Sequence, residues 1–194
     1  MRNIVFATGN SNKIREVNAM LNGEFDIIGL KDIGCTEEIP ETQNTITGNA
    51  LQKARYVRDN YGKDCFSEDT GLEVDALDGA PGVYTARYGG PERSAEKNMT
   101  KLLTELKSKS NRGAQFKTVI ALLLDGEEHT FTGIARGHIR TEKSGEGGFG
   151  YDPVFVPEGY DITFAEMNAA EKNKISHRGK AVRQLIAFLR ERAQ

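Results

Sequence analysis

The stretch FATGNSNK at residues 6–13 decides the fold class, because it marks the passage from a predicted strand to a predicted helix. The apolar run at residues 4–7 predicts a buried strand. From Asn12 onward the apolar residues recur at the spacing of one helical face, and Gly23 ends that pattern. A strand that leads directly into a helix is typical of α/β proteins.

The rest of the chain continues this alternation. Further strands are predicted at residues 25–30, 65–66, 72–76, 115–124, 128–139 and 154–156, and further helices at 49–61, after Ser94 and around 182–189. The dipeptide Asp125-Gly126 between two long strands is a strong hairpin signal. These patterns predict a single α/β domain over residues 1–194 with a mixed sheet, in which the hairpin forms one lobe.

Length and composition limit the classes of function. A chain of 194 residues suits one domain, or two lobes that share one core. Its 26 basic and 28 acidic residues give a net charge of −2, which argues against binding to nucleic acid or to an anionic membrane. Cys35 and Cys65 form no C-x-x-C pair, so neither a disulfide scaffold nor a zinc site is indicated. The longest aliphatic run, residues 119–124, is too short to cross a bilayer, and no signal peptide precedes the first strand, so a cytoplasmic protein is expected.

The opening stretch has the features of an anion site. The start of a helix leaves N–H groups unpaired, and the helix dipole favours negative charge there. Thr8 adds a hydroxyl, Asn10 an amide and Lys13 a positive charge. The alternative is an ordinary turn between strand and helix, with Asn12 as the helix cap. A Walker P-loop is excluded because Ile14, and not serine or threonine, follows Lys13.

The carboxylates of SEDTG, residues 67–71, are expected to end a strand just before a tight turn. Glu68 and Asp69 are adjacent there, and a preceding acidic loop that contains Glu41 could face them. Clusters of carboxylate oxygens hold Mg²⁺ beside substrate phosphates. The alternative is a pair of acids on a solvated turn.

Two later segments also carry candidate binding residues. The stretch GEGGFG at 145–150 satisfies G-x-G-x-x-G, but Pro153 opposes the helix that a dinucleotide site requires. It is either a loop that closes over a ligand with the rings of Phe149 and Tyr151, or a connection with core aromatics. The stretch AEKNKISHRGKA at 170–181 gathers basic residues that could bind an anion or a carbonyl oxygen, unless it is simply a solvated helix start.

Seven short motifs occur in a fixed order along the chain. They are T-G-N-x-x-K at 8–13, E-T at 41–42, G-N-A-x-x-K-A at 48–54, E-D-T-G-L at 68–72, A-P-G-x-Y-x-A-R-Y at 80–88, G-G-F-G-Y-D-P-x-F at 147–155 and E-K-N-x-x-S-H-R at 171–178. In this order they resemble the inosine triphosphate pyrophosphatase family, also called the Ham1-like family, from residue 4 to about residue 189.

The resemblance implies an elongated α/β fold whose central mixed sheet is flanked by helices, with two lobes and the active site in the cleft between them. It implies a homodimer that uses Mg²⁺ to hydrolyse ITP, dITP and XTP to the monophosphate and pyrophosphate. Such an enzyme removes deaminated purines from the nucleotide pool.

The resemblance also implies site residues. Asp69 would be the catalytic proton acceptor, and Glu41, Glu68 and Asp69 would lie at the metal. The implied substrate-binding residues are Thr8, Gly9, Asn10, Ser11, Asn12 and Lys13 in the triphosphate loop, Lys53 and Thr70, Phe149, Gly150, Tyr151 and Asp152 at the base, and Lys172, His177 and Arg178.

This chain departs from the family pattern at two places. Pro40 stands where many bacterial relatives carry a second acid before the position of Glu41, and Glu68-Asp69 replaces Asp-Asp. Two other interpretations compete with this one. The first is a pyrophosphatase of the related Maf-like group that acts on pyrimidine or modified nucleotides. The second is a nucleotide-binding regulatory module without turnover.

Overall fold

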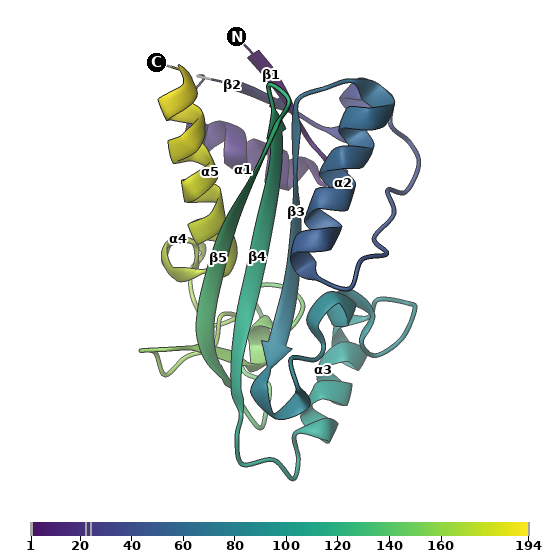
Figure 1. The fold of residues 1–194 in the computed structure, drawn as a ribbon. Helices are drawn as coiled ribbons and strands as arrows, with labels where there is room; N and C mark the ends of the chain where they lie inside the picture. Colours follow the sequence, from purple (N-terminus) through teal and green to yellow (C-terminus); the bar gives the residue numbers. More distant parts are fainter. Residues whose placement is uncertain (1, 22, 24, 194) are drawn as a thin grey trace. The chain divides into compact units, whose positions relative to one another are not determined.

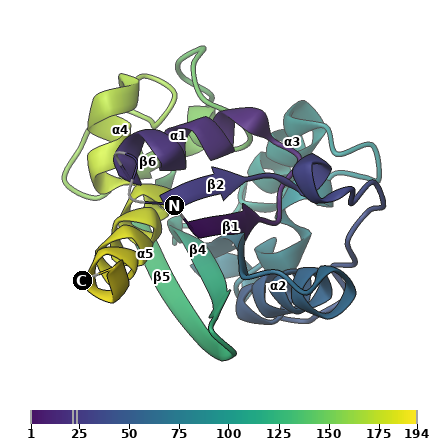
Figure 2. The same ribbon diagram turned by 90° about the horizontal axis from the view of Figure 1, so that it is seen from above.

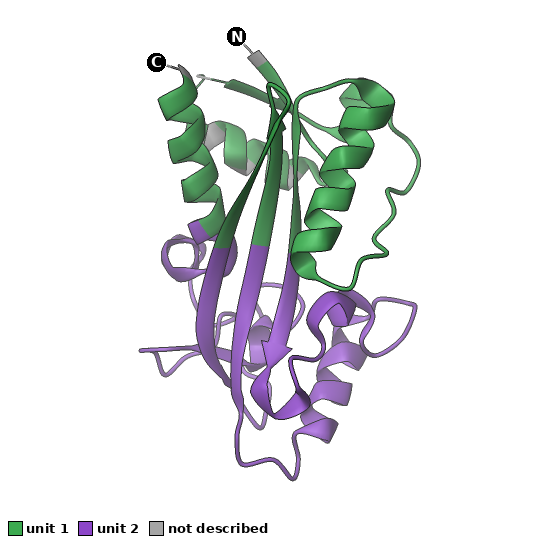
Figure 3. Cartoon of the chain, viewed as in Figure 1, with its two compact units in different colours: residues 1–69, 119–132, 181–194 green, residues 70–118, 133–180 purple. Residues whose placement is uncertain are grey.

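The computed structural model describes residues 2–21, 23 and 25–193, and the chain divides into two compact units. The first unit comprises the described parts of residues 1–69, 119–132 and 181–194, and the second comprises residues 70–118 and 133–180 (Figure 3). Each unit has its own hydrophobic cluster. A single domain over the whole chain, with its site in a cleft, remains a prediction.

Within the described residues, six strands form a mixed sheet in the order β2-β1-β3-β4-β5-β6 (Figure 1). Their bounds are β1 Arg2–Phe6, β2 Phe25–Ile28, β3 Cys65–Val74, β4 Gly113–Leu124, β5 Glu127–Ile139 and β6 Phe155–Pro157. β1 pairs in parallel with β2 and β3, whereas β5 and β6 are antiparallel. The predicted α/β class with a mixed sheet is therefore confirmed.

The predicted helices are present, whereas α4 Ala169–Ile175 was not predicted. The others are α1 Ser11–Leu21, α2 Ile46–Tyr61, α3 Ala95–Glu105 and α5 His177–Ala193. Ser94 caps α3 by accepting a hydrogen bond from the Lys97 amide, and Asp125-Gly126 forms the predicted hairpin with positive φ angles of 52° and 82°. No helix in the described part of the chain is both long and apolar enough to span a membrane.

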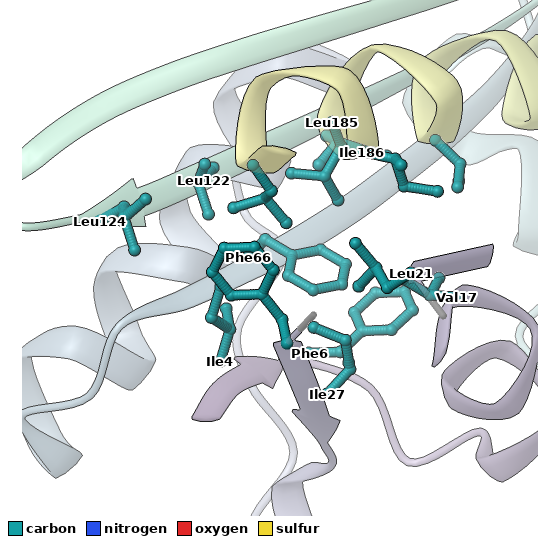
Figure 4. Packing of buried hydrophobic residues seen from close by; sticks show 14 of the residues in the cluster. Ile4, Phe6, Val17, Leu21, Ile27, Phe66, Leu122, Leu124, Leu185 and Ile186 are labelled. Carbon is teal, nitrogen blue, oxygen red and sulfur yellow. The ribbon is translucent and has the colours of Figure 1, made fainter. Parts of the chain in front are cut away.

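In the first unit, the alternation of side chains along the strands separates two faces. Ile4, Phe6 and Phe66 lie with residues of α1 and α5, among them Val17 and Leu185, in one apolar cluster (Figure 4). Residues at the intervening positions of β3 face α2 instead. The Ser67 hydroxyl donates to the Ala50 carbonyl, and the Cys65 thiol donates to the Ala54 carbonyl.

The helices α1 and α2 are seen with β1 and β2 between them (Figure 2). Two glutamates at the start of β5, next to the hairpin turn, bind arginines of α2 and α5. Glu128 accepts hydrogen bonds from Arg55 and Arg58 of α2, and Glu127 accepts one from Arg192 of α5.

The second unit has an aromatic core. The rings of Phe116, Phe155 and Phe164 pack together, with centroids 4.8 to 6.1 Å apart. The buried face of α3, including Leu102, belongs to the same cluster. Aromatic residues dominate such cores because each removes a large apolar area from water.

Three of the boundaries that differ from prediction lie next to predicted site residues. β3 runs without a break from Cys65 to Val74, so the expected turn after Glu68-Asp69 is wrong. β3 lies between β1 and β4 in the order of the sheet, and β1 pairs with it at Cys65 and Phe66. Farther along, the Leu72 amide donates to Thr85 Oγ1 and the Val74 amide donates to the Ala80 carbonyl. These hydrogen bonds keep the strand extended past the local turn signal of Thr70-Gly71.

The other two differences are helix starts. α1 begins at Ser11, and the Asn10 side chain accepts a hydrogen bond from the Lys13 amide, so Asn10 and not Asn12 is the cap. α2 begins at Ile46, earlier than predicted, because the Thr45 hydroxyl caps it by accepting from the Gly48 amide.

Candidate active site

Glu68 and Asp69 are adjacent on β3, and their side chains point to opposite faces of the strand. On one face, the Lys13 ammonium of α1 donates to the Glu68 carboxylate, whose side chain is 6% exposed. On the other face, Lys53 Nζ of α2 lies 3.5 Å from Asp69 Oδ1. The two acids therefore bind different lysines from different helices.

Lys53 is the centre of this group. Its ammonium donates to Glu41 Oε1 at 2.6 Å and to the Glu68 carbonyl oxygen at 2.8 Å, in addition to the ion pair with Asp69. The side chains of Lys53 and Asp69 are only 12% and 15% exposed, respectively. We call Lys13, Glu41, Lys53, Glu68 and Asp69 the lysine–carboxylate cluster. All five lie in the first unit.

Burial raises the pKa of the Asp69 carboxyl above its ordinary value, because a buried charge loses its hydration. The negative charge of Glu41 also raises this pKa, whereas the Lys53 ammonium and a hydrogen bond from Asn49 lower it. Asn49 is a contact of Asp69 that sequence reasoning missed. It lies within the G-N-A-x-x-K-A motif, but nothing in the pattern itself identifies its partner.

The start of α1 adds polar groups to the same unit. Thr8 Oγ1 accepts a hydrogen bond from the Asn10 amide at 3.2 Å. A side chain added at Gly9 would meet no atom within 4 Å, so the backbone there faces open space. Ser11 is exposed, and the side chain of Asn12 lies outside the described part of the structure. A phosphate role for these residues remains a prediction, although Asn10 already has a structural one.

The predicted metal ligands are not all brought together. In the described part of the chain, no group of three or more His, Cys, Asp or Glu side chains is placed to hold a metal ion. Glu41 and Asp69 do converge, since both place a carboxylate oxygen at Lys53 Nζ, 2.6 and 3.5 Å away. Mg²⁺ is usually held by one or two carboxylates together with water and substrate phosphates, so this donor set fits it.

A second group of predicted residues lies in the second unit. Lys172 Nζ is 2.5 Å from Asp152 Oδ2 and 5.5 Å from the centre of the Phe149 ring. Asp152 Oδ2 also accepts a hydrogen bond from the Phe149 amide at 2.8 Å. The Phe149 ring is 76% exposed. We call Phe149, Asp152 and Lys172 the aromatic–lysine group; it presents an open ring face beside a cation.

The two aromatic rings of the glycine-rich segment have different environments. Tyr151 is buried, and its hydroxyl donates to the Thr85 carbonyl at 2.9 Å. Burial raises the pKa of Tyr151 as well. Phe149 can therefore offer its ring to a ligand, whereas Tyr151 is a core residue.

The glycines of this segment are needed for close packing. A side chain added at Gly148, where φ is +73°, would meet the Asp152 carboxylate at 2.1 Å. At Gly147 it would meet the Ala165 carbonyl at 2.7 Å. The segment is thus fixed against its own unit.

His177 and Arg178 begin α5. The His177 ring is buried and stacks on Phe116, with centroids 4.6 Å apart and planes 15° apart, and Arg178 is half-buried. The other predicted contact, Thr70, is linked to Thr118 by a hydroxyl–hydroxyl hydrogen bond of 2.6 Å.

Comparison with known proteins identifies the family. The model of the Ham1 family matches residues 4–188. The protein named dITP/XTP pyrophosphatase from Flavobacterium psychrophilum is 58% identical over 96% of this chain and 98% of its own length. The protein of the same name from Porphyromonas gingivalis is 53% identical over 97% and 98%.

Solved structures agree with the sequence comparison. The Ham1 protein of Staphylococcus aureus superposes with a TM-score of 0.94 at 38% identity, over 98% of this chain and 100% of the other. The HAM1 protein of Coxiella burnetii has the same TM-score at 36% identity, over 98% and 100% of the two chains. From this match in sequence and in fold, the chain belongs to the Ham1 family.

Proposed function

We infer that this chain is a dITP/XTP pyrophosphatase, which hydrolyses ITP, dITP and XTP to the nucleoside monophosphate and pyrophosphate. The observation that carries this conclusion is the lysine–carboxylate cluster, in which Lys53 joins Glu41 and the largely buried Asp69, in a chain of the Ham1 family. Relatives at 53% and 58% identity bear the name of this enzyme.

In the proposed reaction, water attacks the α-phosphorus, and the bond breaks between that phosphorus and the oxygen that joins it to the β-phosphorus. A new P–O bond forms on the monophosphate, and pyrophosphate leaves with the bonding electron pair. Negative charge increases on the leaving group, so fixed cations close to it lower the barrier. Lys13 and Lys53 supply those cations, and their ammonium groups would also donate to phosphate oxygens of the bound nucleotide.

Asp69 accepts the proton of the attacking water. Its carboxyl is mostly buried, and burial raises its pKa, which makes it a better proton acceptor than an exposed aspartate. The ion pair with Lys53 would fix the orientation of the Asp69 carboxylate.

The proposal includes Mg²⁺, held by Glu41 and Asp69. When bound, the cation would neutralise phosphate charge and align the triphosphate. The convergence of two carboxylates at one point supports this assignment.

Base recognition is proposed for the aromatic–lysine group together with His177 and Arg178. Hypoxanthine and xanthine carry an oxygen at C6, where adenine carries an amino group. The exposed Phe149 ring offers a stacking surface, and the cationic donors Lys172 and Arg178 suit a C6 oxygen but oppose an amino group. The proposal extends to a homodimer acting in the cytoplasm.

A panel of nucleoside triphosphates tests the proposal. The purified protein is assayed with ITP, dITP, XTP, GTP, ATP and pyrimidine triphosphates, with and without Mg²⁺, and the products are resolved by chromatography. We expect monophosphate and pyrophosphate from ITP, dITP and XTP only in the presence of the metal. Preferred turnover of pyrimidine nucleotides would indicate a Maf-like activity, and binding without any turnover would indicate a regulatory module.

A further inference from the structure

The segment that carries Glu41 is attached to α2 by side-chain amides. Residues 41–43 have no regular secondary structure, so their backbone N–H groups need partners from elsewhere. The Thr42 amide donates to Gln52 Oε1 at 2.9 Å, and the Gln43 amide donates to Asn49 Oδ1 at 2.9 Å. Gln52 Nε2 in turn donates to the Thr42 hydroxyl at 2.9 Å. Two consecutive backbone groups are thus bound by one helix.

The face of α2 is built for this contact. Asn49, Gln52 and Lys53 are spaced i, i+3 and i+4, so they lie side by side on the helix. A side chain added at the helical residue Gly48 would meet Gln43 Cβ at 2.8 Å, so glycine lets the segment lie directly on the first turn. Asn49 is 3% exposed, which makes its hydrogen bonds costly to lose.

We propose that Asn49 and Gln52 are positioning residues of the active site: they hold residues 41–43 on α2 so that Glu41 stays at Lys53 beside Asp69. This inference rests on the proposed function. The contact from Lys53 to Glu41 comes from the same helix face, at 2.6 Å. A displacement of about 1 Å in a catalytic group can cost about 100-fold in rate, so the anchoring of this segment bears directly on turnover.

Gln52 is the better residue to test, because Asn49 is also bonded to Asp69. Gln52→Ala removes both hydrogen bonds to Thr42, whereas Gln52→Glu keeps an oxygen that accepts from the Thr42 amide. Asn60→Ala is the matched control. Asn60 is an exposed amide of the same helix that bonds to the Tyr56 carbonyl and does not touch the segment.

Hydrogen exchange tests the anchoring itself. We expect the Thr42 amide to exchange at least about 10-fold faster in Gln52→Ala than in the wild type, because its acceptor is gone. Asn60→Ala leaves that exchange rate unchanged, and Gln52→Glu retains most of the protection. If Thr42 exchanges equally fast in the wild type and in Gln52→Ala, the inference is overturned, whether or not the protein is active.

A double-mutant cycle tests the link to Glu41. With dITP as substrate, we expect Gln52→Ala to lower kcat about 10-fold with little change in KM, and Gln52→Glu to keep most of the wild-type kcat. In a Glu41→Gln background, Gln52→Ala causes no further loss, because Gln52 acts through Glu41. Equal losses in both backgrounds overturn the inference. Absence of dITP turnover in the wild type contradicts the proposed function instead, while the exchange experiment still decides the anchoring.

Discussion

At the scale of single residues, neighbouring acids have different environments. Glu68 is bound by Lys13 from α1, whereas Asp69 is bound by Lys53 from α2 and has a raised pKa. This difference supports the proposed role of Asp69 as proton acceptor, because a largely buried carboxylate with a raised pKa takes up a proton more readily.

Replacement of Asp69 by asparagine should abolish most of the activity. Asp69→Asn keeps the size of the side chain but removes the proton acceptor, so we expect turnover of dITP to fall by about 10²–10⁴-fold. Pyrophosphate release measures this loss. Asp161→Asn, at an exposed loop position, is the control and should retain wild-type turnover. Near-normal turnover in Asp69→Asn would show that another group accepts the proton.

Arg178 should affect the choice of base. Arg178→Ala removes a donor suited to the C6 oxygen of hypoxanthine, so KM for ITP should rise by about 10-fold or more, while any hydrolysis of ATP should change little. Steady-state kinetics on both nucleotides measures the difference. An equal loss on ITP and ATP would assign Arg178 to the phosphates.

At the scale of elements, α2 organises the loop before it as well as the site. Glu37 accepts hydrogen bonds from the hydroxyls of Tyr56 and Tyr61 at 2.9 and 2.5 Å. The bond from Tyr61 is the main cause that lowers the pKa of Glu37 to about 2 from its ordinary 4.5. The folded state therefore binds the ionised form of this side chain preferentially.

The stability contributed by Glu37 should depend on pH in a defined direction. Because its pKa is lower in the folded state, the contribution is complete above the unfolded pKa of 4.5 and is lost as the pH falls towards about 2. Wild type should therefore be more stable than Glu37→Gln at pH 7, and the gap should shrink through this window. Urea unfolding of both proteins at a series of pH values measures the gap. A gap that is constant from pH 7 to pH 2 would contradict the assignment.

Elements with strong local signals could be predicted from the sequence. Asp125-Gly126 forms its hairpin, and Ser94 caps its helix. The continuity of β3 could not be predicted, because it depends on hydrogen bonds to partners outside residues 67–71, such as Ala80 and Thr85. The lysine that pairs with each acid could not be predicted either, since Lys13 and Glu68, for example, are separated by 55 positions in the chain. Motif order identified the family, but the roles of Asn49 and Gln52 depend on tertiary contacts.

At the scale of the whole molecule, the predicted site residues fall into two units. Lys13, Lys53 and Asp69 belong to the first unit, whereas Phe149 and Arg178 belong to the second. The proposed function requires phosphate binding by the residues of the first unit and base binding by those of the second.

Fragments of the substrate can test this requirement. Lys13→Ala should weaken the binding of pyrophosphate by about 10- to 100-fold and leave IMP unaffected, because a charged hydrogen bond contributes about 1.5–3 kcal/mol. Phe149→Ala should weaken the binding of IMP and leave pyrophosphate binding unaffected, since stacking contributes about 1–3 kcal/mol per base. A non-hydrolysable ITP analogue should be sensitive to both variants. Calorimetry measures all three affinities, and an analogue that responds to only one variant would contradict these roles of Lys13 and Phe149.

Glu68 and Asp69 point to opposite faces of β3, and this also restricts which insertions and deletions of codons the gene can tolerate. Removing one codon between Cys65 and Glu68 would move each acid to the other face, so that the lysines would meet the wrong carboxylates. Insertions in the irregular segment before α2 turn no side chain to another strand face, although those at Glu37 or at residues 41–43 would break contacts with α2. We therefore expect natural insertions and deletions in this protein's lineage to accumulate before residues 41–43 and to be rare in β3.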